Sequence, residues 1–185
     1  MKSQDIILIL KFIQLEQQIS YDEIPYWQSD SPYAVRNLAG ELGISKSEIS
    51  ASIQRSISSG LAIRTRSDTA ILIPHNEFFK FIIYGLKYAF PVKPGAIKRG
   101  IPTAHSAPVF KEKLLSGGED KYVWPHALGQ EKGEAIEPLF KSVPETALKN
   151  QFLYDCLALI DAIRVGKQRE TAVAKDLLAE RIFPQ

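Results

Sequence analysis

The sequence has only one cysteine among its 185 residues, which limits the redox and metal chemistry open to the chain. Cys156 has no second cysteine with which to form an internal disulfide, and it cannot build a structural zinc site unaided. A chain without disulfides suits a reducing compartment, so we expect a cytoplasmic protein. Because Cys156 falls on the apolar side of a predicted helix, we interpret it as a small core residue.

Histidine is also scarce, and its three copies show no catalytic or metal-binding spacing. His75, His105 and His126 lie far apart, and none belongs to a His-x-x-x-His pattern with a nearby carboxylate. The Gly117-Gly118 pair lacks the Lys-Ser/Thr of a phosphate-binding loop. The His105-Ser106 pair suggests nucleophilic catalysis, but no Gly-x-Ser-x-Gly elbow surrounds it. We therefore expect no enzyme and no metal or other cofactor, with an enzyme that uses the His105-Ser106 loop kept as an alternative.

The chain also lacks a strong charge bias and a long apolar run. Its formal net charge is +2, with 45% hydrophobic and 24% charged residues, values near the globular average. Such a charge excludes a uniformly basic coat for nucleic acid, although a local basic face is still compatible with it. The most apolar later stretch, Phe78–Phe90, is interrupted by Lys80 and Lys87 and is too short to cross a bilayer. We expect no membrane contact.

Helical periodicity marks the first part of the chain. An apolar run predicts a helix from about Gln4 to Gln17. A second helix is predicted from Pro32, with Ser31 as its cap, to Leu42. Gly43 should end it in the left-handed conformation.

A third helix is predicted to follow after a short turn. Ser45 and Glu48 have the spacing of a capping box, in which each side chain bonds the other residue's backbone N–H. Isoleucines recur every four residues at Ile49, Ile53 and Ile57, which predicts one core-facing side. The opposite side is small or polar, as a helix that enters a DNA major groove requires.

A β-hairpin is predicted directly after the third helix. Leu61 and Ile63 alternate with Arg64 and Arg66, which places the two apolar side chains on a buried face and the arginines on the other. Turn residues and a second apolar run, Ala70–Pro74, complete the hairpin. Arginines on such a hairpin are suited to contact phosphates or the minor groove.

These residues carry a resemblance to a known family. The segment from Tyr33 to Ile63 contains the pattern Leu-Ala-x-x-Leu-Gly-Ile-Ser-x-Ser-x-Ile-Ser followed by Gly-Leu, and it resembles the winged helix-turn-helix of MarR-like transcription regulators. The resemblance covers about residues 5–75. It implies DNA-base contacts from Ser47, Ser50, Ala51 and Gln54. It further implies backbone contacts from Ser45, Lys46, Arg55, Arg64 and Arg66.

Three positions depart from the family pattern. Ala51 stands where a basic residue is common, which weakens the predicted attraction to phosphate. Ser52 and Ser56 occupy positions that are usually apolar and face the core. They predict either a looser core or a polar neighbour contributed by another part of the chain.

The second half of the chain is predicted to be helical after a long loop. An aromatic helix, His75–Tyr88, leads into a Pro- and Gly-rich stretch from Phe90 to Pro108 that we interpret as a loop. No acidic residue occurs between Glu77 and Glu112, so this loop is either a solvated linker or a further contact with the DNA backbone. Its candidate contact residues are Lys93, Lys98 and Arg99. Further helices are predicted at Glu134–Lys141, at Pro144, at Gln151–Val165 and at Lys167–Ile182, and a short strand at Tyr122–Pro125.

Together these patterns predict a mainly α protein with a small β-hairpin wing. The predicted regions are a winged helix-turn-helix domain (1–89), a basic irregular segment (90–133) and a C-terminal helical region for dimerisation or effector binding (134–185). We expect a homodimeric repressor that binds double-stranded DNA at a palindromic operator. An antitoxin-like or scaffold protein whose C-terminal half binds a partner protein is the alternative. The sequence leaves open whether a small-molecule or protein effector binds.

Overall fold

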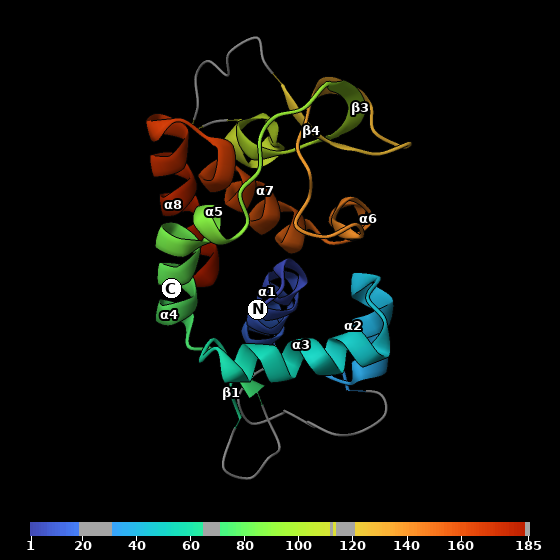
Figure 1. The fold of residues 1–185 in the computed structure, drawn as a ribbon, viewed down its shortest axis with the longest axis vertical. Helices are drawn as coiled ribbons and strands as arrows, with labels where there is room; N and C mark the ends of the chain where they lie inside the picture. Colours follow the sequence, from blue (N-terminus) through green and yellow to red (C-terminus); the bar gives the residue numbers. More distant parts are fainter. Residues whose placement is uncertain (19–30, 65–70, 112, 114–120, 184–185) are drawn as a thin grey trace. The chain divides into compact units, whose positions relative to one another are not determined.

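The computed structural model describes residues 1–18, 31–64, 71–111, 113 and 121–183. Helices dominate, and the described strands form one two-stranded and one three-stranded sheet (Figure 1). The chain divides into an N-terminal unit, Met1–Phe78, and a C-terminal unit, Phe79–Gln185. Among the described helices, none has the length and apolar character needed to cross a membrane. The prediction of a mainly helical chain is confirmed, whereas the three-stranded sheet was not predicted.

Helix α1 (Ser3–Gln18) agrees with the predicted first helix to within one residue at each end. Every residue from Gln4 to Leu15 is buried, because the apolar side chains surround most of the helix. Within the N-terminal unit, α1 contacts both α2 and α3. It therefore serves as the support on which α3 is fixed.

Helix α2 (Val35–Leu42) begins three residues later than predicted. The carbonyl of Ser31 accepts from the N–H of Ala34, and its hydroxyl accepts from the N–H of Tyr33. These bonds make a turn in which Pro32 takes the second position, a place that proline favours. The predicted cap at Ser31 is thus wrong. The predicted ending is confirmed, since Gly43 has φ 62° and ψ 32°.

Helix α3 (Lys46–Ser58) begins where predicted, but its inner side differs from the prediction. The Ser45 hydroxyl accepts from the N–H of Glu48, whereas the Glu48 carboxylate binds Arg55 and Lys2 and makes no return bond to Ser45. The capping box is therefore half formed. The residues buried on α3 are Ile49, Ser52 and Ser56, while Ile53 and Ile57 are half-buried.

Strands β1 (Ile63–Arg64) and β2 (Ile71–Leu72) pair antiparallel, which confirms the hairpin. The prediction that Ile63 is buried beside Leu61 is wrong, because Ile63 is 52% exposed. Leu61 and Ala62 do not belong to the strand. Their N–H groups both donate to the carbonyl of Ser56, so strand alternation starts only at Ile63. Arg66 lies outside the described residues.

The predicted aromatic helix His75–Tyr88 is confirmed as a helical segment with an internal change of period. It consists of α4 (His75–Lys80), the π-helix η2 (Phe81–Gly85) and α5 (Leu86–Ala89). The boundary between the two units falls within α4. In a π-helix each turn takes an extra residue, which shifts the side of the helix on which the following residues lie.

Three strands follow in the C-terminal unit and close on themselves: β3 (Ile97–Pro102), β4 (Tyr122–Pro125) and β5 (Glu131–Ala135). Strand β3 is antiparallel to both β4 and β5, which are parallel to each other. The predicted strand at 122–125 is confirmed. The predicted loop is wrong over 97–102, as is the predicted helix at Glu134–Lys141. The predicted boundary between residues 133 and 134 falls inside β5.

Two glycines explain why these strands were mistaken for irregular structure. A Cβ atom at Gly100 would collide with the carbonyl of Trp124, and one at Gly133 would collide with the carbonyl of Lys121. Glycine is therefore required here by close approach of the strand backbones, although in sequence it suggests a loop.

Three helices complete the C-terminal unit: α6 (Val143–Lys149), α7 (Gln151–Val165) and α8 (Gln168–Ile182). The structure confirms the predicted bounds of α7 and, to within one residue, those of α8. Pro144 lies in the first turn of α6, as predicted. Cys156 is fully buried on α7, and this burial raises the pKa of its thiol. Its predicted place in the core is confirmed.

Candidate nucleic-acid interface

The outer side of α3 presents polar side chains that are exposed to solvent. Lys46, Ser47, Ser50 and Gln54 are exposed, and Ala51 is half-buried. Within the described residues, Ser47 and Ser50 make only local side-chain bonds, from Ser50 to the carbonyl of Lys46 and between the hydroxyls of Ser45 and Ser47. No carboxylate lies among these exposed residues. This side of α3 can therefore donate and accept hydrogen bonds without repelling phosphate.

The inner side of α3 is held by a charged cluster that sequence analysis did not foresee. The guanidinium of Arg55 donates to both carboxylate oxygens of Asp5, at 2.6 Å from Nη2 and 3.0 Å from Nε. Nη2 also donates to Glu48 at 2.6 Å. The Asp5 side chain is fully buried, and that of Arg55 is 23% exposed. Arg55 was predicted to contact phosphate, and in the structure its guanidinium is bonded to these two carboxylates.

Asp5 also explains one of the two unusual serines of α3. The Ser52 hydroxyl donates to Asp5 Oδ1 at 2.7 Å, so the predicted polar neighbour of Ser52 comes from α1, forty-seven residues earlier. Asp5 lies in the first turn of α1 and accepts from the N–H of Lys2 at 2.7 Å. The free N–H groups at a helix start stabilise a negative charge there. Asp5 thus ties the beginning of α1 to the middle of α3.

The cluster shifts the proton affinities of its members. Burial alone would raise the pKa of Asp5, but the bonds from Arg55, Lys2 and Ser52 hold that pKa below its ordinary value. Bonds from Arg55 and Lys2 likewise lower the pKa of Glu48. The bond to Asp5 raises the pKa of Arg55. All three groups are therefore charged at neutral pH.

We expect acid to weaken the N-terminal unit through this cluster. A carboxylate with a lowered folded-state pKa contributes stability that is complete above its unfolded-state value, near pH 4, and is lost as the pH falls through the folded-state value. Urea denaturation midpoints at a series of pH values should drop steeply below about pH 4. Asp5→Asn should flatten that drop. An identical pH slope for wild type and Asp5→Asn would contradict the assignment.

Of the two hairpin arginines predicted to contact DNA, only Arg64 lies among the described residues. Arg64 is half-buried on β1, directly opposite Ile71 on β2. Ile63 and Leu72 face each other across the same hairpin and are 52% and 40% exposed. This apolar pair was not expected from sequence, because alternation had assigned Ile63 to the core.

The C-terminal unit carries a second group of exposed cations. Lys93 precedes β3, and Lys98 and Arg99 lie on it, all of them exposed. Arg99 is paired across the strands with Lys132 of β5, and its Nε donates to the carbonyl of Gly129 at 2.6 Å. Like charges on directly opposed residues repel each other, so an anion bound between them would be stabilising. Lys132 was missed because β5 was not recognised as a strand.

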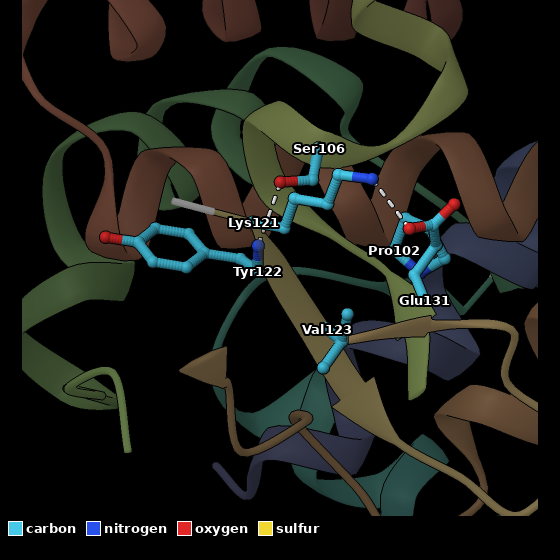
Figure 2. A pocket seen from close by; sticks show the side chains of 6 residues that line it. All are labelled: Pro102, Ser106, Lys121, Tyr122, Val123 and Glu131. Carbon is cyan, nitrogen blue, oxygen red and sulfur yellow. Dashed lines mark hydrogen bonds and ion pairs between the residues drawn. The ribbon is translucent and has the colours of Figure 1, made fainter. Parts of the chain in front are cut away.

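The His105-Ser106 pair has local roles in the structure. It lies on the short helix η3 (Ala104–Ser106). The Ser106 hydroxyl accepts from the N–H of Tyr122 at 2.9 Å, and the His105 ring packs edge-on against Tyr122 with 4.7 Å between centroids. Ser106 and Tyr122 also line a hollow of about 70 Å³, whose lining includes the ion pair of Lys121 with Glu131 (Figure 2). This volume is far smaller than that of a typical substrate site.

The other two histidines also have partners within the fold. His75 Nε2 lies 2.6 Å from a carboxylate oxygen of Glu16, and His126 Nδ1 accepts from the N–H of Leu128. Over the described part of the chain, no three metal-binding side chains come together.

Comparisons with known proteins find no matching family model, no matching curated protein and no matching solved structure.

Proposed function

We propose that the protein is a sequence-specific, double-stranded-DNA-binding regulator whose N-terminal unit is a winged helix-turn-helix of the MarR-like kind. The observation that carries the proposal is the arrangement of α2 and α3. A left-handed Gly43 and a Ser45 cap join the two helices across a short turn, and the solvent side of α3 offers only small, polar or basic groups. A recognition helix needs this combination to enter the major groove.

In this function α3 reads bases from its exposed side. Gln54 is suited to a bidentate bond with adenine, Ser47 and Ser50 donate to or accept from base edges, and the Ala51 methyl packs against a thymine methyl. Ser45 and Lys46 contact the adjacent phosphates. Arg55 contributes indirectly, because its bonds to Asp5 and Glu48 hold α3 in place on α1. It is a positioning residue.

Two copies of the chain would bind one operator. Each α3 would occupy a major groove, so the half-sites should lie about 10–10.5 base pairs, or a multiple of that, apart. Arg64 would contact the backbone beside α3. The cations of the C-terminal unit supply a further attraction that does not depend on sequence: Lys93, Lys98, Arg99 and Lys132.

Selection from randomised duplex DNA tests the proposal. The wild-type protein should enrich a motif with twofold symmetry. Recovery of unrelated sequences, or no retention of duplex at low salt, would overturn it.

Gln54→Ala should reduce base preference with little effect on folding. Gln54 is exposed, and its side chain makes no bond within the described part of the chain. Its removal should therefore cost about 1–3 kcal/mol on the selected duplex. Affinity for a scrambled duplex should be unchanged. Fluorescence-anisotropy titration of both duplexes gives the comparison, with Ser58→Ala on the same helix as the control for a general surface effect. A parallel loss on the two duplexes would assign Gln54 to non-specific binding instead.

Removing a cation from the C-terminal unit should weaken binding to every duplex equally and leave base preference unchanged. Lys98→Ala and Lys132→Ala should each weaken selected and scrambled duplexes to the same extent. Each should also lower the slope of log affinity against log salt concentration by about one. Titration at several salt concentrations measures the slope, and Lys149→Ala on α6 serves as the charge-matched control. An unchanged slope in both variants would remove the β3–β5 cations from the interface.

A further inference from the structure

Two tyrosines of the C-terminal unit are exposed to an unusual extent for side chains of their size. Tyr84 on η2 and Tyr88 on α5 are 72% and 74% exposed. They are four residues apart, whereas their neighbours Ile82, Ile83 and Leu86 are buried. Large exposed aromatic side chains on one side of a helix are typical of a contact surface.

Lysines accompany both rings. Lys87 Nζ lies 4.9 Å from the ring centre of Tyr88. Lys175 Nζ, which comes from α8, lies 5.7 Å from the ring centre of Tyr84. Neither ammonium forms an ion pair with any carboxylate in the described part of the chain. The surface formed by Tyr84, Lys87, Tyr88 and Lys175, which we call the tyrosine–lysine surface, therefore combines apolar area with uncompensated positive charge.

The elements that carry this surface are fixed to each other. Phe79 on α4 and Phe183 at the end of α8 pack edge to face, with 5.5 Å between ring centres. The cation–π contact between Lys175 and Tyr84 is a second link between the two segments. Within the C-terminal unit, α5 and α8 both contact α7. A rigid surface loses little conformational entropy when a partner binds it.

We propose that the tyrosine–lysine surface binds an acidic segment of another protein. Tyrosine side chains serve as anchors in protein interfaces, where they bury a large area at low entropic cost. The two ammonium groups would pair with carboxylates of the partner across the rim of the contact. This surface lies on the C-terminal unit and its binding does not depend on the DNA-binding proposal.

The placement of the lysines favours a protein partner over single-stranded nucleic acid. Binding of a single strand relies on open aromatic faces on which bases stack. Here each ring already carries an ammonium group over one face.

Binding of defined probes by the full chain tests this inference. The probes are a synthetic helix-forming peptide of glutamate, leucine and alanine, its lysine-for-glutamate counterpart and short oligothymidylate. Isothermal titration should detect the acidic peptide alone. Tyr84→Ala and Tyr88→Ala should each weaken its binding about tenfold, equivalent to about 1.4 kcal/mol. Lys87→Ala combined with Lys175→Ala should weaken it and reduce its salt dependence.

A matched control distinguishes binding at this surface from non-specific binding to exposed apolar side chains. Leu148 is 54% exposed on α6, and neither of the cation–π contacts found among the described residues involves α6. Leu148→Ala should leave binding of the acidic peptide unchanged. The inference is overturned if the acidic peptide does not bind, if oligothymidylate binds in its place, or if Leu148→Ala weakens binding as much as Tyr84→Ala does. None of these results bears on the affinity of α3 for duplex DNA.

Discussion

Asp5→Ala should cost the protein about 3–5 kcal/mol of folding free energy, the loss typical of breaking a buried ion pair. The side chain of Asp5 has no exposed area, and it accepts from Arg55 and Ser52 on α3. Its removal leaves the Arg55 guanidinium without its main partner and Ser52 without an acceptor. For a chain of this length the melting temperature should fall by about 2–4 °C for each kcal/mol lost. Urea and thermal denaturation monitored by circular dichroism measure both quantities.

An exposed member of the same cluster provides the control. Lys2 Nζ lies 3.2 Å from Glu48, but the Lys2 side chain is 57% exposed. Lys2→Ala should therefore cost about 1 kcal/mol or less. If Asp5→Ala were as mild as Lys2→Ala, the view that Asp5 fixes α3 on α1 would be wrong. If α3 is the recognition helix, as proposed, Asp5→Ala should also weaken binding of duplex DNA while leaving the exposed side of α3 unchanged, because it removes the support of Arg55.

Arg164→Leu should have a comparable effect on the C-terminal unit. Arg164 and Asp161 have side-chain exposures of only 4% and 2% and are joined at 2.7 Å. The guanidinium also donates to the backbone carbonyls of Phe90 and Glu137. Without Arg164, Asp161 would keep a buried charge supported only by Trp124 and Thr103. The expected loss is about 3–5 kcal/mol.

A double variant tests whether the unpaired charge of Asp161 causes this loss of stability. Burial raises the pKa of Asp161, although bonds from Arg164, Trp124 and Thr103 oppose that rise. Asp161→Asn removes the charge and keeps a carbonyl oxygen that can accept from Trp124. In an Arg164→Leu background, Asp161→Asn should therefore restore about 1–2 kcal/mol. No recovery would show that loss of the bonds to Phe90 and Glu137, not the unpaired charge, explains the single variant. Lys121→Ala, which breaks an exposed ion pair with Glu131, should be nearly neutral.

The helices could be predicted because their signals are local. Gly43 and Ser45 define the turn between α2 and α3 within a few residues, and the apolar period of Gln151–Val165 gives α7 with its observed bounds. Such features depend on backbone conformation and on neighbours one turn away.

The features that were missed depend on residues far apart in sequence. Strand β3 pairs with β4 and β5, more than twenty residues later, and Gly100 is required only because the strands approach closely. The partner of Arg55 is Asp5, fifty residues earlier. An arginine on a predicted recognition helix looks available for phosphate until that carboxylate is located. Lys132 became a candidate only once its pairing with Arg99 was known.

The most direct test of the proposed function asks which surface of the bound protein touches DNA. A photo-cross-linking amino acid placed at position 54 should form an adduct with base-paired DNA of the selected sequence, because Gln54 lies on the exposed side of α3. The same group at position 180, exposed on α8, should form none. Cross-linking from position 180 but not from position 54, with the duplex still bound, would contradict the assignment of α3 as the recognition helix.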